Sequence, residues 1–174
     1  MAALLYLVDT LLSLAEFAFL VRLLLQWGRA DFRNPLVRAL VQVTNPVLVP
    51  LRRMLPAVGQ VDTSSVLVVL VLAMLRAGAP FLLTGLGLLP ALLLLKLALV
   101  QVARMVLWIY FISILGVALL SMLQAGAYSP MLELLGRLTE PVLRPLRRLP
   151  QPANLDLSPL WACILIQALL LLLP

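Results

Sequence analysis

Long apolar runs alternate with short basic segments along this chain. A helix that crosses a bilayer needs about 20 apolar residues. Four runs meet or approach that length, at residues 4–27, 61–83, 88–123 and 156–173. The third run has no polar turn to divide it, so we expect one long or tilted helix that protrudes on one side. The pattern therefore predicts an all-α integral membrane protein with four transmembrane helices.

The segments between the spans predict the topology. Residues 28–60 carry five arginines and residues 124–155 carry four. Arginine and lysine are enriched in cytoplasmic loops. With four spans both segments lie on the cytoplasmic side, and both termini lie on the non-cytoplasmic side. A fifth span would separate the two segments, so the charges favour four.

The two basic segments contain copies of one motif. Residues 44–53 and 139–148 are identical at eight of ten positions, at an offset of 95 residues. The same offset pairs Asn34-Pro35 with Ser129-Pro130. Such self-similarity indicates an internal repeat.

Each copy contains a span, a basic segment and a second span. We therefore expect two parallel span–interfacial helix–span repeats, at residues 1–86 and 87–174. Alternating-access carriers more often use inverted repeats, so this arrangement disfavours a transporter without excluding one.

Each basic segment is predicted to begin with a short amphipathic helix. Pro35 and Pro130 suit the first helical position, and Asn34 and Ser129 before them are good N-caps. Apolar residues recur behind them at helical spacing, so we expect both helices to lie in the membrane interface.

Two prolines four residues apart follow in each copy, and then a pair of arginines. The second proline cannot donate to the carbonyl of the first, so we expect the helix to be kinked or broken there. The arginines would lie beside lipid headgroups, where each attracts anionic phosphate by about 1 kcal/mol. The motif is either a topological anchor or a specific site for anionic lipid or a partner protein. The candidate contact residues are Pro46, Pro50, Arg52, Arg53, Pro141, Pro145, Arg147 and Arg148.

Ionisable residues within spans are costly and are functional candidates. Asp9 and Glu16 are seven residues apart on one helix face. Counting residues from the cytoplasmic ends gives similar depths for Asp9 and Arg104, and for Glu16 and Arg76. We expect two interhelical ion pairs, Asp9–Arg104 and Glu16–Arg76. The alternative is an ion or proton pathway, but a cation route should leave acidic charge in excess. Arg22, near the end of its span, is expected to extend its side chain to the interface.

Composition agrees with a membrane protein. Hydrophobic residues make up 64% of the 174 residues and charged residues 11%, and the mean hydropathy is +1.13. Ordinary soluble domains have roughly 45–50% hydrophobic residues and about 25% charged residues. The net charge is +6, but aromatic and basic residues are not interleaved as in nucleic-acid-binding proteins.

Signatures of catalysis are missing from the sequence. The chain has no histidine and one cysteine, Cys163, and contains no catalytic triad, metal cluster or nucleotide-binding loop. Asp62 and Asp156 each precede a span, where an acidic group favours the helix dipole. We expect a non-enzymatic protein with no cofactor, no metal and no nucleic-acid partner.

The repeated pattern resembles the YggT family of bacterial and plastid membrane proteins. The second copy departs from it at Met122, which stands in place of Trp27, and at residues 152–154, which replace a glycine-containing turn at 58–60. The residues that carry the resemblance are Arg22, Gln26-Trp27, Asn34-Pro35, Thr44, Pro46, Pro50-Leu51-Arg52-Arg53, Pro56 and Asp62 in the first copy, and Pro130, Thr139, Pro141, Pro145-Leu146-Arg147-Arg148, Pro150 and Asp156-Leu157-Ser158-Pro159 in the second.

The resemblance implies a multi-pass protein of the bacterial inner membrane. Family members are linked to osmotic-stress tolerance and potassium uptake, to cell division and envelope organisation, and in plastids to haem attachment. An adaptor or assembly factor accommodates most of these roles, with a membrane protein or a second copy as its partner. The alternative is a small ion channel or transporter.

Overall fold

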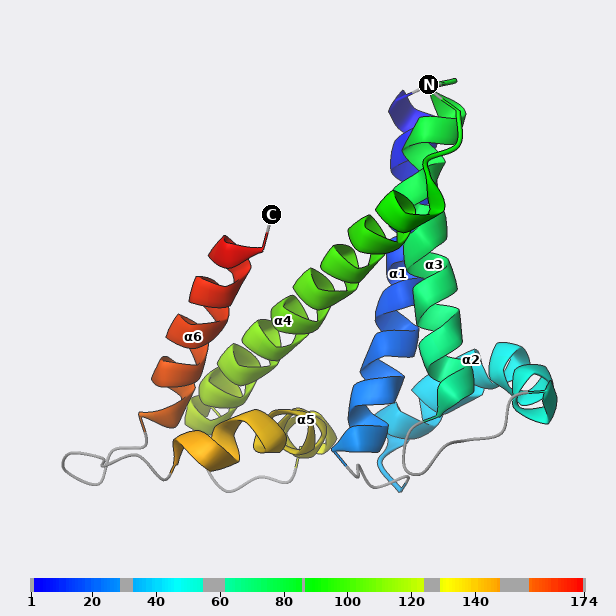
Figure 1. The fold of residues 1–174 in the computed structure, drawn as a ribbon. Coiled ribbons are helices and arrows are strands. Elements are labelled where there is room, and N and C mark those ends of the chain that lie inside the picture. The colour runs from blue at the N-terminus through cyan, green and yellow to red at the C-terminus, as the bar shows by residue number, and fades with distance from the viewer. Residues whose placement is uncertain are drawn as a thin grey trace. The chain divides into compact units, whose positions relative to one another are not determined.

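The structure is a computed structural model that describes residues 2–28, 33–54, 62–85, 87–123, 129–147 and 157–173. These residues form only α-helices and short connections, which confirms the all-α prediction. The helices are α1 (Ala2–Trp27), α2 (Pro35–Met54), α3 (Thr63–Leu83), α4 (Ala91–Leu123), α5 (Pro130–Leu146) and α6 (Ser158–Leu172) (Figure 1).

Three of the described helices are long and apolar enough to cross a membrane: α1, α3 and residues 91–121 of α4. The helix α4 continues unbroken over 33 residues, which confirms the single long helix expected there. At 1.5 Å per residue it extends about 50 Å, well beyond the roughly 30 Å of a hydrocarbon core. The apolar helix α6 has 15 residues and is shorter than such a core is thick.

The two amphipathic helices begin where the sequence predicts. Asn34 Oδ1 accepts a hydrogen bond from Leu36 N at 3.0 Å, and Ser129 Oγ accepts one from Leu132 N at 3.5 Å. Both predicted N-caps are therefore confirmed.

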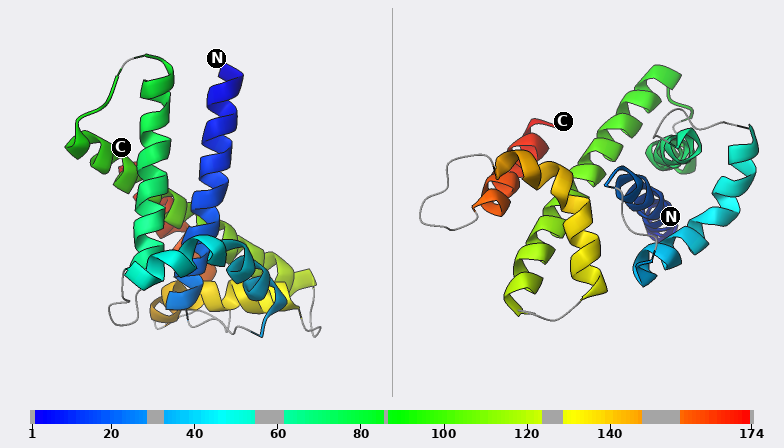
Figure 2. Two further views of the ribbon diagram at one scale, coloured as in Figure 1. Left: turned by 90° about the vertical axis from the view of Figure 1, so that its right-hand side faces the viewer. Right: turned by 90° about the horizontal axis from the view of Figure 1, so that it is seen from below.

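The internal prolines do not break these helices. The helix α2 continues through Pro46 and Pro50, and α5 continues through Pro141 and Pro145, so of the two expected outcomes, a kink or a break, the break does not occur. A kink occurs in α5, whose two halves point in different directions (Figure 2). All four prolines have exposed side chains and lie one turn apart in each pair. The two prolines of each pair therefore lack backbone N–H donors on the same exposed side of their helix, and proline is a known cause of helix kinks.

The chain divides into two compact units. Unit 1 contains residues 1–23 and 44–105, and unit 2 contains residues 24–43 and 106–174. These units divide the chain differently from the repeat boundary after residue 86, because α4 contributes its first half to unit 1 and its second half to unit 2. The repeat boundary follows from the sequence similarity between the two halves of the chain and stays a prediction.

Small residues line the packed face of α3 in unit 1. Ser64, Ser65 and Ala73 have no exposed area, and Ala77 is 5% exposed. Small side chains let helices approach closely without a cavity. In unit 2, α5 packs on α6, and mainly larger apolar side chains form the core. Its buried members include Ile114, Leu138, Leu143 and Ile166.

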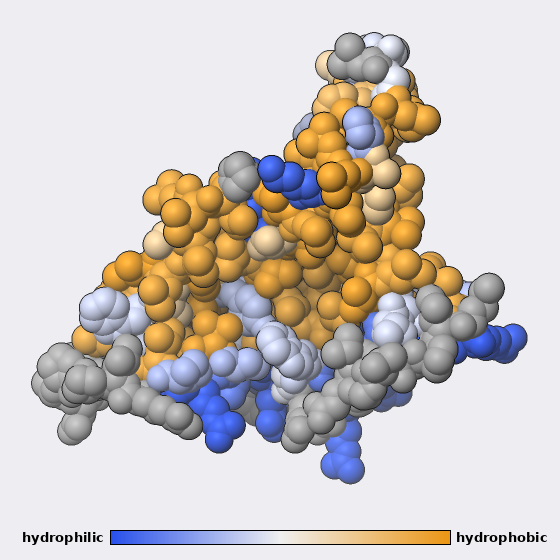
Figure 3. Space-filling view, viewed as in Figure 1, coloured by the Kyte–Doolittle hydropathy of each residue, from blue (hydrophilic) through white to orange (hydrophobic). Residues whose placement is uncertain are grey.

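Large apolar side chains remain exposed along the long helices. Leu11, Leu14 and Phe17 of α1 and Ile112 and Leu119 of α4 are each between 46% and 67% exposed. Figure 3 shows hydrophobic side chains over these helices and hydrophilic ones gathered along α5. Such an apolar surface is too extensive for water and suits lipid.

Candidate functional site

Two carboxylates of α1 meet one arginine of α3. Arg76 Nε lies 2.7 Å from Asp9 Oδ1, and Arg76 Nη1 lies 3.4 Å from Glu16 Oε2. The Glu16 side chain is fully buried, whereas that of Asp9 is 52% exposed. Among the described residues, Glu16 Oε1 has no hydrogen-bond partner.

The structure thus brings Glu16 and Arg76 together, but it gives Asp9 a different partner from the expected Arg104. Counting residues along helices estimates depth in the membrane but not direction around the axis. Asp9 and Glu16 share one face of α1, so both point toward the helix that this face contacts. The long Arg76 side chain reaches both carboxylates across two turns. Arg104 lies on α4 with an exposed side chain.

A second cluster joins α1 to α2. Arg22 is only 8% exposed. Its guanidinium donates to the hydroxyl of Thr44, and to Asn45 Oδ1 at 2.9 Å. Arg22 thus reaches the predicted interfacial helix α2, where a polar site of the protein holds its charge.

A third cluster joins the end of α2 to the start of α3. Arg52 donates to Asp62 Oδ2 from Nη2 at 2.5 Å and from Nε at 3.1 Å, and Ser65 Oγ donates to the same oxygen at 2.8 Å. Burial alone would raise the pKa of the Asp62 carboxyl. Hydrogen bonds from Arg52 and Ser65 and the charge of Arg52 outweigh burial and hold that pKa below its ordinary value.

Asp62 occupies the N-cap position of α3 but makes no capping hydrogen bond. Its carboxylate instead anchors an arginine of the repeated motif. Sequence reasoning assigned Asp62 to the helix dipole and missed this pairing. A signal was present in the sequence, since Asp62 follows Arg52 by ten residues and stands directly before an apolar run.

The remaining residues of the motif lie on the surface. Arg53 is exposed, and so are Pro46, Pro50, Pro141 and Pro145. Arg147 Nη1 lies 3.1 Å from Glu140 Oε2, and both side chains are about half exposed. Arg148 and Asp156 lie outside the described residues.

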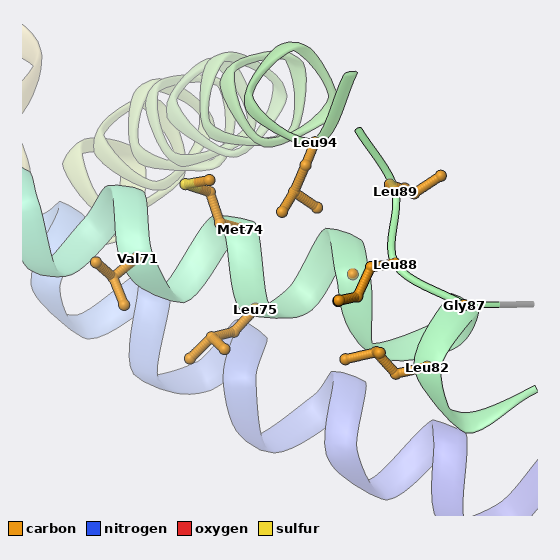
Figure 4. A pocket seen from close by; sticks show the side chains of 9 residues that line it. Val71, Met74, Leu75, Leu82, Gly87, Leu88, Leu89 and Leu94 are labelled. Atoms are coloured by element: carbon orange, nitrogen blue, oxygen red, sulfur yellow. The ribbon is translucent and has the colours of Figure 1, made fainter. Parts of the chain in front are cut away.

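Two pockets among the described residues differ in the chemistry of their linings. A pocket of about 420 Å³ in unit 2 is lined by Val117, Glu133, Gly136, Arg137, Thr139, Glu140 and Arg147. A pocket of about 310 Å³ in unit 1 lies between α3 and the beginning of α4. Its side chains, among them Met74, Leu82 and Leu94, carry no titratable group and point into an apolar space (Figure 4). Within the described ranges, no group of three His, Cys, Asp or Glu residues could hold a metal ion.

Comparison with known proteins identifies relatives over most of the chain. An uncharacterized protein of Pseudomonas aeruginosa is 34% identical over 162 residues, covering 92% of this chain and 82% of the relative. The uncharacterized protein YggT of Escherichia coli K12 is 33% identical over 171 residues, covering 95% of this chain and 86% of the relative. An uncharacterized protein of Vibrio alginolyticus is 36% identical over 159 residues, covering 88% of this chain and 83% of the relative. No solved structure matches.

The family model CCB3/YggT matches two segments, residues 1–83 and 96–174. The two segments begin 95 residues apart, which is the offset between the two motif copies. Together they cover most of the chain. This protein therefore belongs to the CCB3/YggT family.

Proposed function

We propose that this chain is a four-span protein of the bacterial inner membrane that acts, without catalysis, as an assembly or envelope-organisation factor. Its two parallel repeats place the arginines of α2 and α5 on the cytoplasmic face, where they contact anionic lipid or a partner protein. Both termini lie on the other side. In this arrangement α6 is the fourth crossing.

The observation that carries this proposal is the pair of amphipathic helices that bear the arginines. On α2, Val37, Thr44 and Leu48 are at most 3% exposed and recur at helical spacing. The exposed Arg53 lies on the opposite side, at the end of the helix. A helix with one face packed and the other cationic is suited to the membrane interface.

The ion pair between Arg52 and Asp62 fixes this helix end to α3. Arg53, next to it, has an exposed side chain and stays available to a headgroup or a protein. The motif thus combines an anchoring arginine with a surface arginine. This combination supports both interpretations that the motif left open, one for each residue of the pair.

Crosslinking and co-purification from native membranes test the proposal. Replacement of the surface arginines, Arg53→Ala and Arg144→Ala together, should reduce recovery of the partner protein or of anionic lipid. Val43→Ala together with Met131→Ala, which truncates exposed apolar residues of the same two helices, is the matched control. Unchanged recovery in the arginine variant would contradict the assembly role.

The alternative function is a small ion channel or transporter for osmotic balance. One observation favours it: Glu16 is a fully buried carboxylate with an unpartnered oxygen. Purified protein in liposomes should then conduct ions, and Glu16→Gln should abolish the flux. Absence of flux from liposomes with properly folded protein removes this alternative.

A further inference from the structure

The pocket in unit 2 occupies the position that an arginine fills in unit 1. At the repeat offset, Val117 corresponds to Arg22. Thr139 corresponds to Thr44, and Glu140 to Asn45, the two residues that accept hydrogen bonds from Arg22. Val117, Thr139 and Glu140 all line the pocket. The loss of one long side chain therefore leaves its acceptors facing an open space.

A second replacement enlarges this space. Gly136 stands where the first copy has Val41. A methyl group added at Gly136 would meet no atom within 4 Å. Both changes remove volume from the same place, so the pocket of about 420 Å³ can admit a side-chain-sized group.

The buried hydroxyl in the pocket is set to accept rather than donate. Thr139 is 1% exposed, and its hydroxyl donates to the carbonyl of Leu135 at 2.9 Å. Because its one hydrogen is used, the oxygen offers only lone pairs to a ligand. Glu140 replaces a neutral amide with a carboxylate, which accepts more strongly from a cationic donor. A carboxylate has about four acceptor sites, so its pair with Arg147 leaves capacity for another donor.

The charged residues around the pocket also differ between the two copies. Five positions in the first copy hold three arginines and no acidic residue, whereas the second copy holds two arginines and two glutamates. The net charge of these positions thus falls from +3 in the first copy to 0 in the second, so the second set repels a cation less than the first. The paired positions are Arg22, Arg38, Gln42, Asn45 and Arg52 in the first copy and Val117, Glu133, Arg137, Glu140 and Arg147 in the second.

We propose that this pocket is a guanidinium-binding site. A guanidinium group, from the arginine side chain of another polypeptide or from a small free compound, donates to Thr139 Oγ1 and to the Glu140 carboxylate, as Arg22 does to Thr44 and Asn45. The planar fork of donors in a guanidinium suits two acceptors on adjacent residues better than an ammonium does. The site does not depend on the assembly role.

Binding of methylguanidinium to the purified full-length protein tests the site, by saturation-transfer NMR and by thermal unfolding. Methylguanidinium should bind saturably and raise Tm. Methylammonium at equal ionic strength should bind about tenfold more weakly or not at all. Equal responses to both cations, or saturable binding of inorganic phosphate in place of methylguanidinium, would overturn the proposal.

Two variants that test the location of the site place a residue of the first copy at the equivalent position of the second copy. Val117→Arg supplies the missing side chain and should abolish methylguanidinium binding. Leu119→Arg adds the same charge to the same helix at a 60% exposed residue and should leave binding intact. Glu140→Asn restores the residue of the first copy and should weaken binding several-fold without unfolding the protein. Unchanged affinity in Glu140→Asn, or loss of binding in Leu119→Arg, would refute the assignment.

The source of the guanidinium is distinguished with N-acetyl-arginine amide. If this compound binds more tightly than methylguanidinium, the natural ligand is an arginine side chain of a polypeptide. If it binds no more tightly, the pocket takes a free small cation. Either result is expected to disappear in Val117→Arg, and persistence of binding in that variant would overturn the proposal.

Discussion

At the scale of single residues, the buried charges of α1 and α3 differ greatly in what they contribute. An exposed ion pair contributes between 0 and about 1 kcal/mol, whereas removal of one partner from a buried pair costs about 3–5 kcal/mol. Arg76 has both kinds of partner, because Glu16 is buried and Asp9 is half exposed. The two carboxylates should therefore respond differently to substitution.

We expect Arg76→Met to lower the free energy of unfolding by about 3–5 kcal/mol, since Glu16 would remain buried without its cation. Asp9→Asn should lower it by at most about 1 kcal/mol. The double variant Glu16→Met with Arg76→Met should recover most of the loss, because no buried charge remains. Thermal unfolding in detergent measures all three, and a double variant no more stable than Arg76→Met would contradict the pairing.

Asp62 predicts a pH dependence of stability. Its folded-state pKa is lowered, so it stabilises the protein above the unfolded-state pKa of about 3.9 and loses this effect as pH falls through the lowered folded-state pKa. Wild type should therefore exceed Asp62→Asn in Tm at pH 7. The difference should shrink as pH falls below about 4. A difference that stays constant down to pH 2 would mean that the carboxylate does not titrate with folding.

At the scale of helices, Asn34 and Ser129 each cap one helix, but Asn34 also bonds to a second segment of the chain. Asn34 Nδ2 also donates to the carbonyl of Pro130 at 2.7 Å, and Asn34 is 4% exposed. Loss of an N-cap costs about 0.5–2 kcal/mol. We expect Asn34→Ala to lower the free energy of unfolding more than Ser129→Ala does. The stability of Asn34→Asp should fall between that of Asn34→Ala and that of wild type, because aspartate keeps the capping acceptor but loses the donor. Unfolding by denaturant gives this order, and equal losses would contradict it.

The end of α1 approaches α5 too closely for a side chain. A methyl group on Gly28 would lie 2.7 Å from the carbonyl oxygen of Arg137, whereas one on Gly136 would lie in open space. Gly28→Ala should therefore cost about 1–3 kcal/mol, as overpacking does. Gly136→Ala should be neutral or stabilising by up to about 1 kcal/mol, because alanine favours a helix. Comparison of the two Tm values tests the close approach.

Sequence predicted the helices of this fold better than the contacts between them. Helix starts at Pro35 and Pro130 follow from local rules, because an N-cap and a proline act on the next turn alone. The proline rule predicted a kink or a break and could not choose between them, because it ignores the packing that supports the helices at Leu48 and Leu143, which are 0% and 3% exposed. The partner of Asp9 could not be predicted, because hydropathy carries no information about the direction of a side chain around the helix axis.

At the scale of the whole molecule, the number of crossings depends on α6. A span of its 15 residues would extend about 22 Å, less than a typical core of about 30 Å. Thinning of the bilayer or apolar residues next to the helix would have to accommodate the difference. The proposed function requires this crossing for the C-terminus alone. The helices α3 and α4 already bring both basic segments to one side, and a crossing by α6 places the C-terminus on the same side as the N-terminus.

Cysteine accessibility decides this topology. In a Cys163→Ala background, single cysteines at Arg53 and Arg144 should be labelled only from the cytoplasm. A cysteine at Thr84, an exposed residue after α3, should be labelled only from the other side. A tag after residue 174 should share the accessibility of Thr84 if α6 crosses the membrane. A tag reached only from the cytoplasm would show that α6 does not cross, and the chain would then have three spans with its termini on opposite sides.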